Sequence, residues 1–306
     1  MRNDHRYVLG ESENEHSRLR DQSVVLDPLT RSLLIDAGIT EGMRVLDIGT
    51  GSGAVAALAA DLVGSHGHVL AIDRDPTALD GARAVLARHP QVEVAEADLA
   101  GLDLDGEFDA IIGRAVLMHL SEPVETLVTL AQHLRPNGLL VMHEFDLVHE
   151  WASVNTPLWE RVRSLVLTGL DAAGVHIRMG SELFAAFRSA GLPDPHLTMG
   201  APAGGGDQAP SFGWANSLTA LLPYLEQQGM VSDGEFTADS LTQRLDDEID
   251  AANATLLGPL LFGAHCTVPR VPGRPQESMG RTRSISTMRG IGPGRTYAMS
   301  TSPGLR

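Results

Sequence analysis

The chain has 306 residues, of which 43% are hydrophobic and 20% are charged, proportions that are ordinary for a folded enzyme. Residues 269–306 hold seven Arg and one Glu, a net +6, so the total charge of −16 leaves −22 on residues 1–268. Such an acidic body repels nucleic-acid phosphates, and no apolar run is long enough to span a bilayer, so we expect neither a nucleic-acid substrate nor a membrane span.

The N-terminal region is expected to form a helical lid over residues 1–40. A helix is predicted over residues 16–37, with Pro28 as a candidate break because proline removes a backbone donor. The first residues lack the apolar core of a signal peptide. The single cysteine, Cys266, cannot form an internal disulfide. Both features lead us to expect a cytoplasmic protein.

Residues 43–53 are the most informative part of the chain. Val45, Leu46 and Ile48 predict a short buried strand, a turn with three glycines follows, and an Ala-rich helix begins directly after it. This unit opens a nucleotide-binding sheet, and its glycines also fit the loose dinucleotide fingerprint. Asp47 argues against a diphosphate, because a carboxylate at that position repels phosphate and suits a ligand that carries an ammonium group.

Further strands alternate with helices up to residue 142. Three are predicted over residues 69–72, 92–94 and 108–112, and a fifth ends near residue 142. The alternation predicts a mainly parallel, doubly wound sheet. Asp73 ends the second strand, where a carboxylate can accept hydrogen bonds from ribose hydroxyls. At Asn137 we expect a positive φ in the turn that leads into the fifth strand.

The glycine segment resembles motif I of the class I S-adenosylmethionine-dependent methyltransferases, in the pattern Val-Leu-Asp-x-Gly-x-Gly-x-Gly. Residues 117–123 are similar to the family's His-Leu-x-x-Pro segment after strand four, and residues 134–142 to its turn into strand five. Residues 7–10, with the helix after them, resemble a bacterial subgroup of small-molecule methyltransferases, akin to the ubiquinone and menaquinone enzymes. The resemblance implies S-adenosylmethionine as cofactor. The implied cofactor-binding residues are Tyr7, Gln22, Asp47, Gly49, Thr50, Gly51, Gly53, Asp73, Arg74, Asp98, Leu99 and Arg114.

Some of these assignments leave alternatives open. Asp98 is expected to bind the adenine amino group, by resemblance alone. Arg114 is expected either to balance the charge of Asp47 or Asp73, or to bind the carboxylate of the cofactor or of an acidic acceptor. Tyr7 and Gln22 are expected to lie over the cofactor, and the alternative is that Tyr7 packs against the protein and Gln22 is solvated.

Two segments supply candidate catalytic residues. His119, just after the fourth strand, could remove a proton from the acceptor, or could serve a structural or cofactor-side role. Residues 143–150 hold two His and three acidic residues, and we expect a polar loop there with Glu144 as a candidate base. Their spacing matches no standard metal pair, so no metal is expected.

Two insertions are expected to cap the sheet. The first, at about residues 143–178, interrupts a core domain of residues 41–200. The second lies in residues 201–236, within a final segment of residues 201–268. Together they hold all three tryptophans, which are expected to pack the caps and to line the acceptor pocket.

The remaining elements complete the predicted fold. A helix is predicted over residues 179–191, a sixth strand from Pro195 to Met199, and a seventh from Leu260 to Ala264, antiparallel at the sheet edge. Residues 269–306 are expected to form a disordered basic tail.

The predicted fold is therefore an α/β, Rossmann-like, seven-stranded sheet with an α-helical cap. The predicted function is methyl transfer from S-adenosylmethionine to O, N or C of a small-molecule acceptor, and we allow for a homodimer. One alternative is a methyltransferase-fold protein that is non-catalytic or repurposed for another reaction. A less favoured alternative is a nicotinamide-dependent oxidoreductase.

Overall fold

The computed structural model describes residues 13–102, 104, 106–149, 156–206, 209, 214–232 and 234–269, without the side chains of residues 13–21, 238 and 239. The chain divides into Met1–Val271 and Pro272–Arg306, and every described residue belongs to the first unit. The expected tail from residue 270 onward therefore lies outside the described residues.

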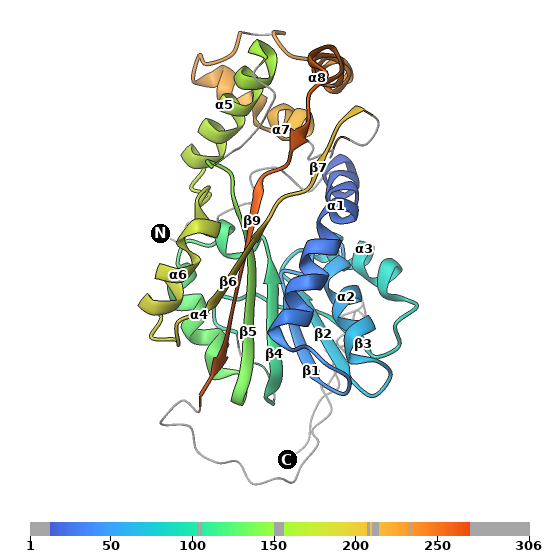
Figure 1. The fold of residues 1–306 in the computed structure, drawn as a ribbon, viewed down its shortest axis with the longest axis vertical. Helices are drawn as coiled ribbons and strands as arrows, with labels where there is room; N and C mark the ends of the chain where they lie inside the picture. The colour runs from blue at the N-terminus through green and yellow to red at the C-terminus, as the bar shows by residue number, and fades with distance from the viewer. Residues whose placement is uncertain are drawn as a thin grey trace, which may run out of the picture. The chain divides into compact units, whose positions relative to one another are not determined.

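A seven-stranded sheet forms the centre of the fold, in the order β3-β2-β1-β4-β5-β9-β6 (Figure 1). Every strand runs parallel to the others except β9, which is antiparallel to both β5 and β6. The strands are β1 (Arg44–Ile48), β2 (His68–Asp73), β3 (Val92–Glu96), β4 (Phe108–Arg114), β5 (Leu134–Asp146), β6 (His196–Gly200) and β9 (Leu260–Val268). The predicted α/β Rossmann-like sheet is confirmed.

The last strands differ in place from the prediction. The final strand is antiparallel as predicted, but it lies between β5 and β6, and β6 forms the edge. The predicted edge position of the last strand was wrong. Strand order depends on which strands hydrogen-bond to each other, and neither the length nor the hydrophobicity of a segment predicts its partner. Asn137 has the positive φ that we predicted, 67°.

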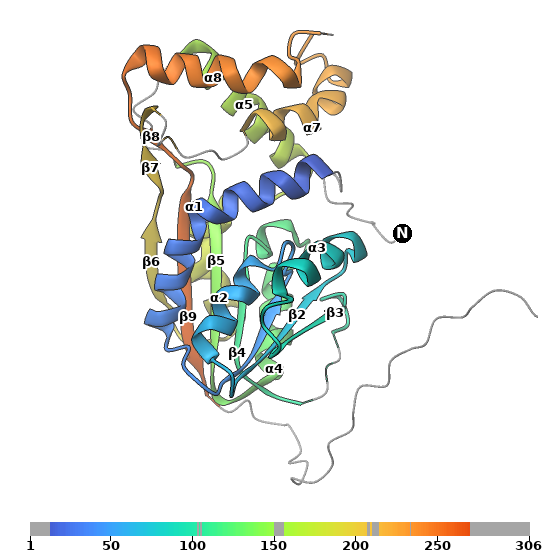
Figure 2. The ribbon, with the colours of Figure 1, turned by 90° about the vertical axis from the view of Figure 1, so that its right-hand side faces the viewer.

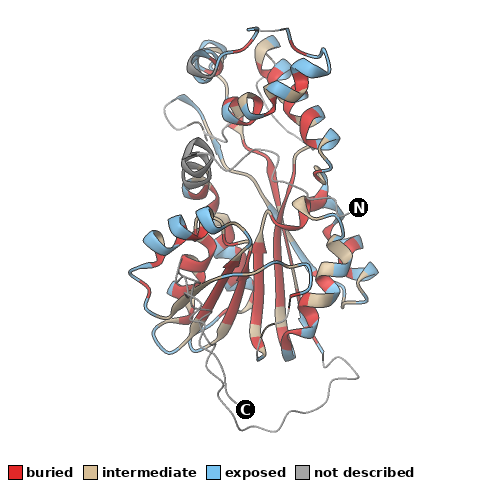
Figure 3. Ribbon diagram, turned by 180° about the vertical axis from the view of Figure 1, so that it is seen from behind, coloured by how far each residue is buried: buried red, intermediate tan, exposed pale blue. Residues whose placement is uncertain are grey.

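Helices cover both faces of the sheet, and alternate strand residues pack against them (Figure 3). Val45 and Val69 face the side with helices α1, α2 and α3, whereas Leu46 and Leu70 belong to the cluster with α4 and α6. These helices are α1 (Glu13–Ala37), α2 (Ala54–Val63), α3 (Pro76–Leu86), α4 (Pro123–Gln132) and α6 (Met179–Ser189). The predicted break at Pro28 is wrong, because α1 continues through it.

Three helices form the cap beyond the carboxyl end of β5 (Figure 2). They are α5 (Pro157–Ala172), α7 (Trp214–Gln227) and α8 (Ala238–Ala252), and a small sheet of β7 (Ala203–Gly204) and β8 (Leu256–Leu257) accompanies them. Helices were expected in both insertions, whereas α8 was not predicted. Of the tryptophans, Trp159 is buried in α5, Trp214 is half-buried at the start of α7, and Trp151 lies outside the described residues.

Candidate functional site

The glycine loop between β1 and α2 is fixed to the end of β2. The Thr50 N–H donates to the carbonyl of Ile72 at 2.9 Å, and the Gly51 N–H donates to Oδ2 of Asp73, also at 2.9 Å. Gly51 has φ 51°, and a Cβ built there would meet no atom nearer than 3.9 Å. A positive φ and open space together allow a ligand to approach this backbone closely.

Two other glycines of the loop hold it against its neighbours. A Cβ on Gly49 would lie 2.7 Å from Cγ2 of Val116, in the turn after β4. A Cβ on Gly53 would lie 3.2 Å from Cα of Ala82 in α3. The predicted cofactor-binding glycines therefore have packing roles as well, because side chains at these positions would displace the turn or the helix.

Asp47 is a buried carboxylate beneath this loop. It is 1% exposed, and neither of its oxygens has a hydrogen-bond partner, nor does the buried hydroxyl of Thr50. Burial, with a smaller contribution from the charge of Asp73, raises the pKa of Asp47 to about 7 against the opposing effects of Thr50, Arg114 and the Ala56 N–H. A buried carboxylate without partners is costly unless a cationic group satisfies it.

The ends of β2 and β3 carry the other expected contacts. Oδ1 of Asp73 accepts a hydrogen bond from the Asp75 N–H at 3.1 Å, and the carbonyl of Asp73 accepts one from Ala97 at 3.0 Å. Asp98 is exposed just after β3, and its Oδ1 accepts from the Ala100 N–H. The remaining two candidates of this region are exposed Arg74 and half-buried Leu99.

Arg114 binds the lid helix. Its guanidinium donates to Oδ1 of Asp27 at 2.9 Å, to the Thr30 hydroxyl at 2.8 Å and to the Ser23 hydroxyl at 3.2 Å. The ion pair of Arg114 is with Asp27, and its charge also lowers the pKa of Asp47, in keeping with the charge-balance alternative. The sequence carried a signal for the true partners, since the three α1 residues recur at helical spacing on one face.

His143 completes this cluster from β5. Its Nδ1 lies 3.2 Å from the Thr30 hydroxyl. Burial lowers the pKa of His143 to about 3, and the charge of Arg114 lowers it too, so the imidazole stays neutral at ordinary pH. The other residues expected in this region are half-buried Gln22 on α1 and Tyr7, which lies outside the described residues.

The prediction of a polar loop over residues 143–150 was wrong for its first four residues. Residues 143–146 continue β5, because they pair with residues 260–263 of β9. Glu144 is fully buried, and its Oε1 accepts from Val116 N–H at 3.0 Å and Leu117 N–H at 2.9 Å, while Oε2 accepts from Met118 N–H at 3.2 Å. With both oxygens so occupied, Glu144 does not present a free base at the rim of the sheet.

Burial raises the pKa of Glu144 to about 7, and the hydrogen bonds from Leu117, Val116 and Met118 oppose that shift. The turn that donates these bonds ends in a short 3₁₀ helix, η1 (Leu117–His119), where the other catalytic candidate, His119, is half-buried. Ala115, at its start, has φ 54°, which is uncommon for a residue other than glycine.

The comparisons with known proteins agree with this geometry. The model of a family described as a methyltransferase domain matches residues 39–173, from the start of β1 through α5. The glycine loop and strands β1 to β5 lie within that match, whereas β6 and β9 lie beyond it. This segment resembles the methyltransferase domain of that family.

Curated relatives of the domain act on different acceptors. A protein-L-isoaspartate O-methyltransferase of Methanococcoides burtonii is 32% identical over 151 residues, 48% of this chain and 64% of its own length. A mitochondrial ubiquinone biosynthesis O-methyltransferase of Schizosaccharomyces pombe is 31% identical over 105 residues, 33% of this chain and 37% of its own. The chain spans between about a third and two thirds of the length of the curated relatives it matches.

Solved structures share the fold of this chain. A Bacillus halodurans protein assigned as a methyltransferase has a TM-score of 0.54 at 18% identity, with 79% of this chain and 99% of that chain covered. The [4+2]-cyclase SpnF has a TM-score of 0.50 at 18% identity, with 79% and 81% covered. Within the described residues, no helix is long and apolar enough to cross a membrane.

Proposed function

We propose that the methyltransferase domain binds S-adenosylmethionine over the glycine loop and transfers its methyl group to a small-molecule acceptor. The observation that carries the proposal is Asp47, a buried carboxylate without hydrogen-bond partners beside a loop whose Gly51 face is open. A ligand with an ammonium group satisfies that carboxylate, whereas the pyrophosphate of a nicotinamide dinucleotide would be repelled.

The chain's own residues divide the binding work. Asp73, held at the end of β2 by the Gly51 and Asp75 N–H groups, accepts from the ribose hydroxyls, and Asp98 with Leu99 holds the adenine. The lid helix, fixed by Arg114, is proposed to cover the loop with Gln22 toward the cofactor. Tyr7, which lies outside the described residues, is proposed as a cofactor contact as well. When bound, the cofactor supplies a methyl group on a sulfonium, which is displaced in line, so alignment of the acceptor is the main requirement.

The acceptor is proposed to bind between the cap and the ends of β4 and β5. The acidic body supports a small molecule over a nucleic acid. The named relatives methylate proteins as well as a quinone precursor, so the quinone subtype is one option among small acceptors. His119 is proposed either as the base that removes the acceptor's proton or as a cofactor-side group.

Isothermal titration with S-adenosylmethionine and S-adenosylhomocysteine tests the proposal. Micromolar-range binding by the full chain is expected, and Asp73→Ala should weaken it at least tenfold. Asp80→Ala is the matched control, because Asp80 is an exposed carboxylate that pairs only with Arg83 on α3. Absence of binding by well-folded wild-type protein would overturn the proposal.

A second candidate function is a cofactor-binding domain that catalyses a different reaction. It is favoured by Glu144, whose engagement with backbone N–H groups removes one of the two candidate bases. The fold is also that of a [4+2]-cyclase, so it does not dictate methyl transfer. Tight cofactor binding without S-adenosylhomocysteine production across a broad acceptor panel would favour this candidate.

A further inference from the structure

The side chain of Glu144 meets three consecutive backbone donors. Val116, Leu117 and Met118 are the first residues of the turn after β4, and their N–H groups point at the two carboxylate oxygens at 2.9–3.2 Å. N–H groups at the start of a helical turn have no partner within the turn itself, and successive N–H groups form a natural anion-binding concavity. Glu144 fills that concavity from within the protein.

The same turn contacts two other parts of the site. Cγ2 of Val116 occupies the space that a Cβ on Gly49 would fill, so the turn lies directly against the glycine loop. On its other side, the carbonyl of Met118 accepts from the His176 N–H at 2.8 Å, and Nε2 of His176 lies 3.0 Å from the carbonyl of Leu120. His176 belongs to the connection between α5 and α6, so the turn joins the glycine loop to the cap.

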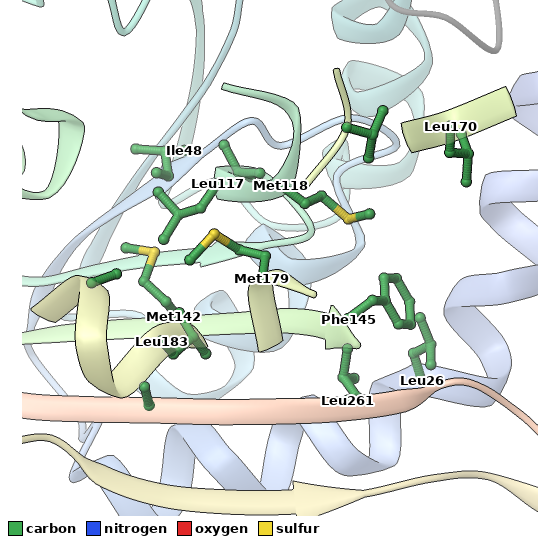
Figure 4. Close-up of a cluster of buried hydrophobic side chains, with 14 of the residues drawn as sticks. Leu26, Ile48, Leu117, Met118, Met142, Phe145, Leu170, Met179, Leu183 and Leu261 are labelled. Atoms are coloured by element: carbon green, nitrogen blue, oxygen red, sulfur yellow. The ribbon is translucent and has the colours of Figure 1, made fainter. Parts of the chain in front are cut away.

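Apolar packing gives the turn a second attachment. Leu117 and Met118 are buried in the cluster that also contains Ile48 of β1 and Met179 of α6 (Figure 4). Packing of this kind fixes side chains but leaves the backbone donors unsatisfied, and a buried donor without a partner is destabilising. Among the described residues, the carboxylate of Glu144 accepts from all three donors at once.

We propose that Glu144 is a positioning residue that fixes the backbone of residues 116–118 between the glycine loop and the cap, and so sets the placement of His119. The effect of Glu144 on the turn is independent of the proposed function, whereas its consequence for methyl transfer rests on that function. Glu144 acts through the turn and has no direct role with the acceptor.

Two measurements on the full chain test the proposal without any substrate. In Glu144→Gln, an amide NH₂ replaces one acceptor oxygen. We expect hydrogen exchange at residues 116–118 to become at least tenfold faster, with exchange in the centre of β4 unchanged. In ¹H–¹⁵N NMR spectra, the three amide protons should also lose the downfield shift that a charge-assisted bond to a carboxylate produces.

Asp146→Asn is the matched control. Asp146 is also fully buried on β5, and its Oδ1 accepts from the Val148 and His149 N–H groups at 3.0 and 2.8 Å, away from the turn. This variant should loosen residues 148 and 149 and leave residues 116–118 as in wild type. S-adenosylmethionine affinity should fall at least tenfold in Glu144→Gln and less than twofold in Asp146→Asn.

Unchanged exchange and shifts at residues 116–118 in Glu144→Gln would overturn the proposal, as would equal loosening of that turn in Asp146→Asn. Failure of the proposed function has a different signature, because wild-type protein would then keep its protected turn and bind no S-adenosylmethionine. A loosened turn with undiminished cofactor affinity would overturn the link between the turn and the site.

Discussion

Asp47→Asn should raise the stability of the ligand-free protein and abolish cofactor binding. The folded-state pKa of Asp47, about 7 against an ordinary 3.8, corresponds to about 4 kcal/mol that the ionised group costs in its buried position. The Asn amide stays buried without a partner and keeps part of that cost. We therefore expect a gain of about 1–2 kcal/mol at pH 8, or about 3–6 °C in Tm.

The effect should depend on pH in a definite direction. Because the pKa of Asp47 is raised in the folded state, folded protein binds more protons than unfolded protein between about pH 4 and pH 7, so the stability from this group is lost as pH rises through that window. At pH 5 Asp47 is neutral in the folded wild type but mostly ionised in the unfolded chain, so the advantage of the variant should fall by about 2–3 kcal/mol between pH 8 and pH 5 and be lost or reversed. Scanning calorimetry of both proteins at pH 5 and pH 8 measures this.

Cofactor binding should shift the pKa of Asp47 in the opposite direction, to lower values. An ammonium group beside Asp47 favours its ionised form, so binding at pH 6 should release close to one proton in wild type, seen as buffer-dependent heat in titration calorimetry. Asp47→Asn should release none and should bind at least a hundredfold more weakly, about 3 kcal/mol. The assigned role of Asp47 would be refuted if Asp47→Asn were less stable than wild type at pH 8 and bound S-adenosylmethionine as tightly as wild type does.

Three further substitutions have defined outcomes. Gly49→Ala should lower the free energy of unfolding by about 2–3 kcal/mol, because Gly49 has a φ of 58° and an added Cβ would clash with Val116. Adding Val116→Ala should restore part of that stability in chemical unfolding. If the double variant regains none, the proposed clash with Val116 is contradicted. Arg114→Ala should cost about 2–3 kcal/mol and expose α1 to proteolysis, because it removes three hydrogen bonds to α1. Asp27→Asn keeps an acceptor for Arg114 and should cost less; equal effects would contradict a contribution from Thr30 and Ser23. His119→Ala should keep S-adenosylmethionine affinity within about threefold and abolish S-adenosylhomocysteine production if His119 is the base, an assignment that retained turnover would exclude.

The sequence predicted the sheet and the glycine loop because both are encoded locally. A buried strand, three glycines and an Ala-rich helix leave few alternatives, and Asp47 stands out as a charged residue among apolar ones. Strand order at the β6 edge could not be read in this way, since residues far apart in sequence pair there. Helix α8 was missed although Leu241, Leu245 and Ile249 recur at the spacing of an amphipathic helix, because they stand among acidic residues that read as a polar segment.

The candidate site was predicted least well where one residue serves a partner far along the chain. Glu144 looked like a loop acid from its neighbours, yet it binds backbone 26–28 residues away. Arg114 was assigned to nearby carboxylates, whereas its ion-pair partner lies 87 residues earlier. Residue type and spacing reveal that a charged group needs a partner, and only the folded chain identifies it.

The way the cap enters the fold has an evolutionary and practical consequence. The chain leaves the sheet for the cap after Asp146 and returns through α6. It leaves again after Gly200 and returns at Leu260. Asp146 and Leu260 are paired neighbours in the sheet. The cap is thus inserted at one end of the sheet, through junctions that include a pair of neighbouring strand residues. Chimaeras that exchange the cap at these junctions and keep the glycine loop would test the proposal that the insertions determine acceptor choice.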